Sequence, residues 1–475
     1  MRFSVALPLL VLGAAGNVSI ATAQSPGTFT ATGSMTIPRA EHSATLLPNG
    51  KVLIAGGYSP TAFSPTVATA ELYDPSTGAF TPTGNMTTAR AGHLATLLAD
   101  GRVLLAGGSG LATAELYDPA TGSFTPAGAM IPIPIPSLSA AMLLRDGRVL
   151  VEGCANPCNS VIAGFYDPAA GTFKDAGPQF AGGGPGVVLA DGKVLIVGGC
   201  PTVGTSAQIF DPGSGVFSPA GLMTNGCLDI NTATLLLNGK VLFVGSDEYP
   251  DPADASLFDP VTGTFANVGP AVAPREYSAA TLIPDGTVLI TGGQLPGGNG
   301  QAVSEFYTPA SGTFSSAGNM VAGRHFHTST LLGDGTVLIA GGFNIWPSPT
   351  STAEIYRPTV LVLAPLLFSL SGDGKGQGAI WNSQTGQIPS ASNPATAGDI
   401  LSMYTNSLAE GGVIPPQVSI GGKPAEVLYF GDAPGYSGYF QVNFRMPNGL
   451  GPDSSAPVRL TYLGRSSNAI TIGVR

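Results

Sequence analysis

One phrase recurs seven times along the chain, and this repeat limits the fold more than any other feature. The phrase is a turn containing glycine, then Val-Leu and a short apolar run, as in Asn49-Gly50-Lys51-Val52-Leu53-Ile54-Ala55-Gly56-Gly57. Asn-Gly and Asp-Gly accept the positive φ angles of a type I′ hairpin turn, so each copy predicts a hairpin of two buried strands. The turn glycines, 45 to 51 residues apart, are Gly50, Gly101, Gly147, Gly192, Gly239, Gly286 and Gly335.

Two further phrases follow each hairpin. The first is an aromatic residue, usually Asp, then Pro, and its aromatics are Tyr73, Tyr117, Tyr166, Phe210, Phe258, Tyr307 and Tyr356. The second is a Phe followed by Gly and usually Met, and its aromatics are Phe29, Phe80, Phe124, Phe173, Phe217, Phe265 and Phe314. Proline ends a strand and the following glycine turns the chain, so each unit predicts four short strands.

The order of the phrases predicts a closed ring. Phe29 precedes every hairpin, whereas the last unit stops at Tyr356-Arg357-Pro358 without a Phe phrase of its own. The N-terminal strand therefore supplies what the last unit lacks, which hides two sheet edges that would otherwise be exposed. With 67 Gly and 41 Pro, a mainly helical fold is excluded. We predict an all-β protein whose residues 24–358 form a seven-bladed β-propeller.

Beyond the repeat, the sequence predicts a linker at 359–365 and a second domain at 366–475. The latter alternates strand-like runs with Gly, Pro and Asn turns, as in Val458-Arg459-Leu460-Thr461-Tyr462, which is typical of a β-sandwich of about 100 residues. It resembles an Ig-like domain common at the C-terminus of secreted bacterial proteins, through segments such as Gln441-Val442-Asn443-Phe444-Arg445-Met446-Pro447.

The N-terminus predicts export. Residues 1–23 combine Arg2, an apolar run from Val5 to Ala15 and the small residues Ala21-Thr22-Ala23, the pattern of a cleaved signal peptide. The run is too short for a membrane span, which needs about 20 residues. A net charge of −10 without a Lys/Arg run argues against nucleic-acid binding. We expect a secreted or periplasmic monomer.

Four cysteines favour disulfides over a metal site. An even count in an exported chain is typical of disulfides, and no second ligand pair accompanies Cys154-Ala-Asn-Pro-Cys158. From the places of the cysteines in the repeat we predict the bridges Cys154–Cys158 and Cys200–Cys227.

Aligning the first strand of each unit gives a column with Arg in units six, seven, one and two, which are consecutive around a ring: Arg275, Arg324, Arg39 and Arg90. A binding interpretation places these arginines at the mouth of the ring, where they would accept an anion or a sugar. The nearby residues in this candidate site are Glu41, His42, His93, Tyr277, His325, Phe326 and His327. The structural alternative is that Arg and His satisfy backbone carbonyls between blades. His325 and His327 lie two residues apart on an expected strand, so their side chains should face the same side. They could form half of a metal site, or they could be a pair at the surface or with their hydrogen bonds satisfied by the protein.

The repeat resembles the kelch family over about residues 27–358. The features that carry the resemblance are the spaced aromatics, Arg-x-x-His before the hairpin, and Gly-Gly at 56–57, 107–108, 198–199, 292–293 and 341–342. Two copies depart, with Gly153-Cys154 and Gly245-Ser246. This resemblance implies a propeller and no particular reaction.

A kelch propeller followed by an Ig-like domain also resembles the copper radical oxidases, such as galactose oxidase. That resemblance implies copper ligands from a Tyr two residues after the column Arg, a Tyr-His pair in another blade, a His of the C-terminal domain, and a Cys cross-linked to the first Tyr. Here Tyr277 matches one Tyr, and Phe326-His327 keeps only the His of the pair. The position two residues after the column Arg holds no Cys in any unit, and the C-terminal domain holds no His. We therefore expect no copper, no other metal and no cofactor.

These observations favour a binding protein over an enzyme. The leading hypothesis is a secreted non-enzymatic protein that presents one propeller face to a glycan or a protein partner. The alternative is an extracellular carbohydrate-active enzyme with its site at the arginine-lined mouth, which would need carboxylates, Tyr or His converging there.

Overall fold

The structure is a computed structural model that describes residues 27–59, 65–130, 137–155, 160–176, 184–198, 205–223, 229–246, 254–273, 275–295 and 297–475. The regular elements of these ranges are all β-strands, so the all-β prediction is confirmed. In the same ranges no helix has the length and apolar character of a membrane span. The predicted signal peptide at 1–23 lies outside the described residues.

Seven four-stranded antiparallel sheets follow the repeat, and we number them in chain order. Sheet 1 contains β2 (Ser43–Leu46), β3 (Val52–Ala55), β4 (Ala70–Asp74) and β5 (Ala79–Pro82). Sheet 2 contains β6 (Leu94–Leu97), β7 (Val103–Ala106), β8 (Thr113–Asp118) and β9 (Ser123–Ala129). Sheet 3 contains β10 (Ser137–Leu143), β11 (Val149–Ala155), β12 (Ser160–Asp167) and β13 (Thr172–Asp175).

The next three sheets repeat the same strand order. Sheet 4 contains β14 (Gly186–Val188), β15 (Val194–Gly198), β16 (Thr205–Asp211) and β17 (Val216–Met223). Sheet 5 contains β18 (Asp229–Leu235), β19 (Val241–Ser246), β20 (Asp254–Asp259) and β21 (Thr264–Pro270). Sheet 6 contains β22 (Ala279–Leu282), β23 (Val288–Thr291), β26 (Val303–Thr308) and β27 (Thr313–Asn319).

Sheet 7 joins the two ends of the repeat. It contains β28 (Thr328–Leu331), β29 (Val337–Ala340), β32 (Ala353–Arg357) and, as its outer strand, β1 (Thr28–Ala31). β1 runs antiparallel to β32, with Phe29 opposite Tyr356. The N-terminal strand thus occupies the place that the order of the phrases predicts.

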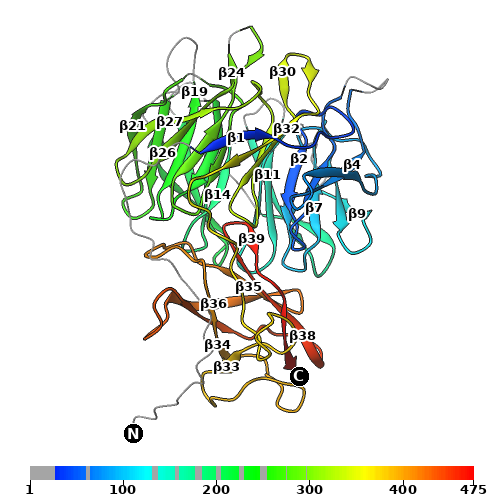
Figure 1. The fold of residues 1–475 in the computed structure, drawn as a ribbon, viewed down its shortest axis with the longest axis vertical. Coiled ribbons are helices and arrows are strands. Elements are labelled where there is room, and N and C mark those ends of the chain that lie inside the picture. The colour runs from blue at the N-terminus through cyan, green and yellow to red at the C-terminus, as the bar shows by residue number, and fades with distance from the viewer. Residues whose placement is uncertain are drawn as a thin grey trace.

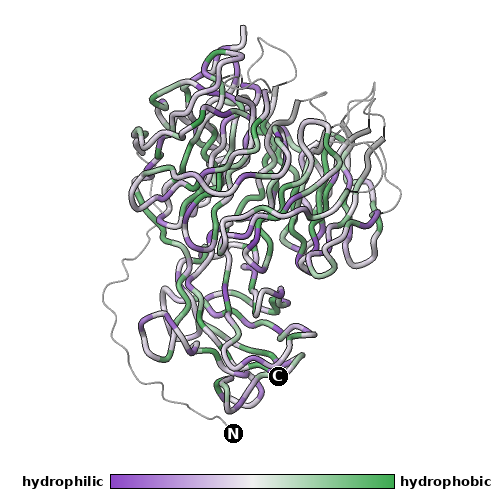
Figure 2. Tube along the Cα trace, turned by 90° about the vertical axis from the view of Figure 1, so that its right-hand side faces the viewer, coloured by the Kyte–Doolittle hydropathy of each residue, from purple (hydrophilic) through white to green (hydrophobic). Residues whose placement is uncertain are grey.

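The seven sheets form a ring. Their first strands contact one another in a closed cycle, β2 to β6, β10, β14, β18, β22, β28 and back to β2. Apolar clusters fill the spaces between neighbouring sheets, for example Ile54 of sheet 1 with Leu338 of sheet 7. In Figure 2 the apolar stretches follow the strands through the interior of this ring. This arrangement is that of a β-propeller.

The two aromatic phrases meet in every sheet. The aromatic residue of the third strand packs against the Phe of the fourth, with ring centroids 4.5 to 5.1 Å apart. The seven pairs are Tyr356–Phe29, Tyr73–Phe80, Tyr117–Phe124, Tyr166–Phe173, Phe210–Phe217, Phe258–Phe265 and Tyr307–Phe314. The recurring aromatics are therefore cross-strand pairs that stabilise the outer half of each sheet.

A small extra sheet stands on the ring, and the repeat pattern did not predict it. It consists of β24 (Gln294–Leu295), β25 (Asn299–Gly300), β30 (Phe343–Ile345) and β31 (Ser348–Pro349). These are two hairpins from sheets 6 and 7, joined where Asn299 pairs with Ile345. They rise at the end of the ring opposite the C-terminal domain (Figure 1).

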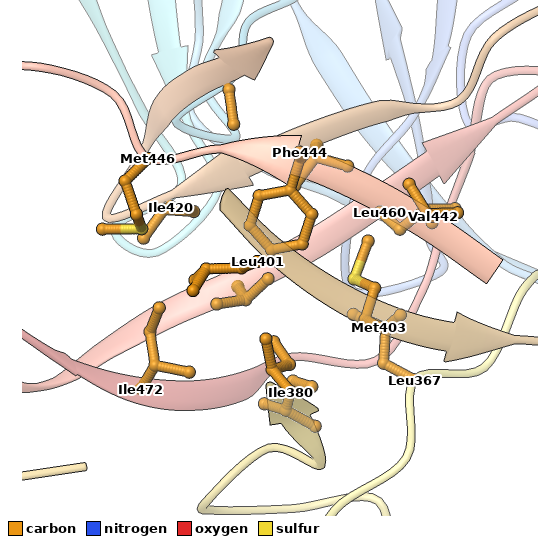
Figure 3. Packing of buried hydrophobic residues seen from close by; sticks show 14 of the residues in the cluster. Leu367, Ile380, Leu401, Met403, Ile420, Val442, Phe444, Met446, Leu460 and Ile472 are labelled. Atoms are coloured by element: carbon orange, nitrogen blue, oxygen red, sulfur yellow. The ribbon is translucent and has the colours of Figure 1, made fainter. Parts of the chain in front are cut away.

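The C-terminal domain is also built from antiparallel strands. They are β33 (Ile380–Asn382), β34 (Ile400–Thr405), β35 (Gln417–Ile420), β36 (Lys423–Asp432), β37 (Phe440–Arg445), β38 (Asp453–Tyr462), β39 (Arg465–Ser466) and β40 (Ile470–Val474). The long strand β36 pairs with β35 at one end and with β37 at the other. One apolar core, including Leu401, Phe444, Leu460 and Ile472, holds these strands together (Figure 3).

This domain meets the ring at the hairpin turns. The Val413 amide donates to the Leu237 carbonyl of sheet 5, and the Ala364 amide donates to the Gly333 carbonyl of sheet 7. Between β38 and β39, Leu463 packs against both the C-terminal core and the apolar cluster of sheets 6 and 7. The hairpin turns therefore face the C-terminal domain, and the extra sheet stands on the other face of the ring.

Candidate functional site

The four arginines of the column are buried inside the ring. Arg39, Arg90, Arg275 and Arg324 are at most 1% exposed. In each, Nη1 donates to the carbonyl of a glycine 17 residues further along the same sheet, at 2.7 to 2.9 Å: Gly56, Gly107, Gly292 and Gly341. Each Nη1 also donates to a carbonyl at the start of the third strand, on Thr69, Thr113, Val303 or Thr352.

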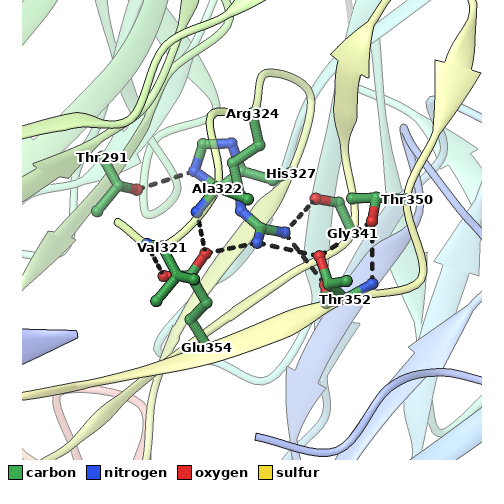
Figure 4. Close-up of polar contacts among 9 residues, drawn as sticks. All are labelled: Thr291, Val321, Ala322, Arg324, His327, Gly341, Thr350, Thr352 and Glu354. Atoms are coloured by element: carbon green, nitrogen blue, oxygen red, sulfur yellow. Dashed lines mark hydrogen bonds and ion pairs between the residues drawn. The ribbon is translucent and has the colours of Figure 1, made fainter. Parts of the chain in front are cut away.

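A glutamate completes each arginine site. The pairs lie 2.6 to 3.1 Å apart and are Arg39–Glu71, Arg90–Glu115, Arg275–Glu305 and Arg324–Glu354. The pair in sheet 6 is an ion pair without hydrogen-bond geometry, whereas Arg324 Nη2 donates to Glu354 (Figure 4). The glutamates also accept amide N–H groups, as from Val321 in sheet 7. Both partners of these buried pairs are thus committed to the fold.

The arginines therefore do not line an open cationic mouth, and that part of the binding interpretation is corrected. Their guanidinium groups point into the sheets because glycine carbonyls and a glutamate satisfy them there. Burial lowers the pKa of Arg39, Arg275 and Arg324, and the facing glutamate opposes this shift. This geometry is close to the structural alternative, but the carbonyls that the arginines satisfy belong to their own sheet and do not lie between blades.

The glutamates are the residues that the sequence analysis missed. Each stands two residues before the aromatic of the aromatic-Asp-Pro phrase, and only in the four units that carry the column Arg. In sheets 3, 4 and 5 the same position holds Gly164, Gln208 and Ser256. This joint occurrence was the signal for an ion pair. We call sheets 6, 7, 1 and 2 the Arg–Glu arc, and sheets 3, 4 and 5 the opposite arc.

Three histidines join neighbouring sheets within the Arg–Glu arc. His93 Nε2 lies 2.8 Å from Ser43 Oγ of sheet 1, His327 Nε2 lies 2.8 Å from Thr291 Oγ1 of sheet 6, and His42 Nε2 lies 3.1 Å from Thr328 Oγ1 of sheet 7. Burial lowers the pKa of His42 and of His93 to about 3, and lowers that of His327 well below its usual value. These histidines are neutral at physiological pH and act as spacers between sheets.

At the mouth, one backbone position has the same left-handed conformation in each sheet of the Arg–Glu arc. Two residues after the column Arg stand Tyr277, Phe326, Glu41 and Gly92, with φ of 52°, 52°, 55° and 62°. Successive amides donate to the preceding sheet's carbonyl: Phe326 to Tyr277, Glu41 to Phe326, and Gly92 to Glu41. We call these four residues the mouth arc. A left-handed conformation costs a residue with a side chain about 1–2 kcal/mol, so three positions carry strain that glycine avoids.

The side chains of the mouth arc gather an aromatic stack and a carboxylate. The rings of Tyr277 and Phe326 stack with centroids 4.0 Å apart and planes at 20°. Both rings and Glu41 are partly exposed. No hydrogen bond or ion pair to another described residue engages the Glu41 carboxylate, and partial burial raises its pKa. The mouth arc therefore offers aromatic surface beside an uncompensated acid.

An aromatic rim continues from this stack onto the extra sheet. Phe326 contacts Phe343 at a centroid distance of 6.1 Å, and Phe343 contacts Trp346 at 4.8 Å. Trp346, which is 53% exposed, also stacks with Tyr58 of sheet 1. His325 is buried against Phe326 and Phe343, and burial lowers its pKa to about 4. The rim thus runs from the mouth to the surface.

The predicted disulfides cannot be placed. Cys154 lies in β11, but Cys158, Cys200 and Cys227 fall outside the described residues. The bridges Cys154–Cys158 and Cys200–Cys227 therefore stay predictions.

A cavity of about 1130 Å³ lies at the other end of the ring, between the hairpin turns and the C-terminal domain. Its walls include Leu97 and Leu143 of the ring and Arg459 of β38. We place the candidate site at the mouth because the strained backbone, the free carboxylate and the aromatic rim converge there.

Comparison with known proteins supports the fold. No family model matches the chain, and no curated protein is similar enough in sequence to match it. Among solved structures, the chain is similar to a fungal alcohol oxidase of the AA5 family in complex with copper, at 18% identity and a TM-score of 0.60. The match covers 95% of this chain and 100% of the oxidase chain. At this identity the likeness shows a shared galactose-oxidase-like fold.

The residues present do not fit a copper centre of the kind that this fold resemblance implies. Phe326 has no donor atom, and His327 Nε2 already bonds Thr291. The C-terminal domain contains no histidine. Within the described ranges no three His, Cys, Asp or Glu side chains are grouped to hold a metal ion. Copper requires several converging N and O donors, so we derive no step through this metal.

Proposed function

We propose that the chain is a seven-bladed kelch-type propeller with an Ig-like C-terminal domain, exported by its signal peptide, that binds a carbohydrate at the mouth arc. The closed cycle of seven four-stranded sheets supports the propeller. The sandwich-like pairing around β36 and its single apolar core support the Ig-like domain.

The strained mouth arc carries the functional proposal. Glu41, Tyr277 and Phe326 hold left-handed backbone conformations at positions where Gly92 meets the same requirement without strain. A fold under selection for stability alone favours glycine at such positions. The cost of retaining these side chains is explained by a role in binding.

The chemistry of these side chains suits a sugar. Aromatic faces pack against the C–H faces of a pyranose ring, and a carboxylate accepts hydrogen bonds from its hydroxyl groups. Tyr277, Phe326 and Trp346 supply the aromatic surface, and Glu41 supplies the acceptor. Trp346 lies between β30 and β31 of the extra sheet, which stands on the ring (Figure 1) and extends the surface available to an oligosaccharide.

A glycan-array screen tests this proposal. We expect the wild-type protein to bind a defined set of oligosaccharides. Trp346→Ala and Tyr277→Leu should each weaken binding about tenfold or more, because the contact of an aromatic side chain with a sugar ring is worth about 1 kcal/mol or more. Val261→Ala, at an exposed site on the outer edge of sheet 5, serves as the control. A screen in which no glycan binds, or in which all variants bind like the wild type, contradicts the proposal.

A second candidate is a carbohydrate-active enzyme that uses Glu41 as a general acid. The raised pKa of Glu41 favours it, because a partly buried carboxylic acid keeps its proton closer to neutral pH. Product analysis of each bound glycan, for new reducing ends and for oxidised products, separates this candidate from simple binding. Turnover that Glu41→Gln abolishes without loss of binding would establish the enzyme.

A further inference from the structure

The mouth arc has no available positive charge, although its sheets contain four arginines. Each guanidinium is buried and faces a glutamate of its own sheet. The lysines lie elsewhere: Lys51, Lys193 and Lys240 are at the hairpin turns, Lys174 is on the outer strand of sheet 3, and Lys375 and Lys423 are in the C-terminal domain. Among the described residues, the charged side chains in the mouth arc or next to it in the chain are therefore acids, Glu41 and also Glu276, which precedes Tyr277.

Glu41 and its aromatic neighbours attract the same kind of group. The Glu41 amide donates to the Phe326 carbonyl, so Glu41 follows Phe326 around the mouth, and its Oε2 lies 3.8 Å from where a Cβ on Gly92 would stand. A half-buried carboxylate without a partner is stabilised by a cation, and the faces of aromatic rings attract cations as well. An anion at this place would meet repulsion from both.

We propose that the ligand of the mouth arc carries a protonated amino group, and that its class is an oligosaccharide of amino sugars with free amines. This inference rests on the proposed carbohydrate-binding function and adds the charge of the ligand to it. The ammonium lies against the Glu41 carboxylate, while the sugar ring packs on Tyr277 and Phe326. A carboxylate or sulfate on the sugar excludes it from the site.

Three oligosaccharides of equal length and linkage test the inference: a β-1,4-linked glucosamine oligomer, its fully N-acetylated form, and the glucose oligomer. They differ at one carbon, which carries an amine, an acetamide or a hydroxyl. At neutral pH and low salt, titration calorimetry with the full chain is expected to give about tenfold tighter binding of the amine than of the other two, as a partly desolvated charge pair with a cation–π contact predicts.

Variants locate the preference. Glu41→Gln keeps the size of the side chain and is expected to reduce the preference to less than about twofold, because the charge is gone while the aromatic surface remains. Glu426→Gln removes an exposed acid of the C-terminal domain and is expected to leave the preference intact. Phe326→Leu is expected to weaken all three oligomers alike.

The outcomes separate the two proposals. Equal or tighter binding of the acetylated or hydroxyl oligomer overturns the amine inference and leaves the carbohydrate-binding proposal standing. Amine preference that Glu41→Gln does not change overturns the assignment to Glu41. Failure of all three oligomers, together with an empty glycan array, overturns both.

Discussion

The seven sheets of the ring pair their strands in the same order, but the two arcs differ in the polar residues inside their sheets. In the Arg–Glu arc each sheet encloses a buried ion pair, and the main-chain carbonyls of Arg39, Arg90 and Arg324 accept an amide N–H from the glycine pair of the preceding sheet. In the opposite arc the glutamate position holds Gly164, Gln208 or Ser256, yet the strands pair in the same order. The ion pairs are therefore not needed to form a sheet. They fix the backbone that enters the first strand, which is where the mouth arc lies.

The two arcs also differ in the buried charge they leave unsatisfied. In the opposite arc, Glu152 of β11 is fully buried, and neither of its carboxylate oxygens has a hydrogen bond to a described residue. Burial raises its pKa to about 8. In the Arg–Glu arc the fully buried glutamates face arginines, and the fully buried histidines His42 and His93 are held neutral. The two arcs should therefore respond to pH in opposite directions.

The largest expected effect comes from breaking an ion pair. Glu354→Ala leaves Arg324 buried and unpaired, which should cost about 3–5 kcal/mol of unfolding free energy in urea denaturation. The matched change in the opposite arc, Gln208→Ala, should cost about 1 kcal/mol, because it removes a neutral amide. Equal losses of unfolding free energy in Glu354→Ala and Gln208→Ala would contradict the difference in stabilisation that we infer between the two arcs. The double variant Arg324→Met with Glu354→Leu should recover most of the loss.

Glu152 gives the next largest effect. Its folded-state pKa of about 8 exceeds its usual 4.5, so its full contribution is present below pH 4.5 and is lost as pH rises toward 8. Glu152→Gln should abolish this alkaline loss, which amounts to about 3 kcal/mol at neutral pH. Unfolding at several pH values measures it. An unchanged pH profile in Glu152→Gln would show that the carboxyl has a partner in solution.

His93 should show the opposite dependence. Its folded-state pKa of about 3 lies below its usual 6.5, so its contribution is complete above pH 6.5 and is lost as pH falls toward 3. His93→Gln keeps a hydrogen-bonding group for Ser43 and should lessen the loss between pH 6.5 and about 5 by about 1–2 kcal/mol. The same pH series of unfolding curves checks this, and an acid loss equal to that of the wild type would contradict it.

The smallest expected effect on stability comes from variants of the mouth arc, which distinguish a role in stability from a role in ligand binding. Glu41→Gly relieves a left-handed backbone and should leave stability unchanged or raise it by up to about 1 kcal/mol, while removing the acid that binds ligand. Gly92→Ala introduces strain at the equivalent position and should cost about 1 kcal/mol, and its methyl group would lie 3.8 Å from Glu41 Oε2, an ordinary contact that keeps the acid in place. Thermal unfolding and ligand titration of both variants measure the two quantities. A large destabilisation by Glu41→Gly would assign Glu41 a structural role instead.

The architecture could be predicted from the sequence because short phrases of the repeat specify its turns and strand contacts. Asn-Gly and Asp-Gly turns, the paired aromatics and the early Phe29 each specify one contact, and those contacts are present. The role of the arginines was harder to predict, because Arg39 looks the same whether it faces a ligand or Glu71. Only the joint occurrence of Arg and Glu across units distinguishes the two cases.

Other parts of the site had no signal in the repeat. The pairing of Asn299 with Ile345 joins two loops whose sequences differ from those of other units. The left-handed conformation of Glu41 and Tyr277 depends on hydrogen bonds between sheets, which a single unit does not reveal. Such features arise from the assembled ring and become visible only in three dimensions.

The outer strand of sheet 7, β1, is synthesised long before the strand with which it pairs. Gly27, just ahead of β1, bonds the hydroxyl of Tyr356, which lies 329 residues later in the chain. The ribosome therefore releases β1 long before its partner exists. Until β32 arrives, the first strand presents unpaired edges to its surroundings. The ring closes only when nearly the whole propeller has emerged, because the first strand of the ring pairs with the last one that is made.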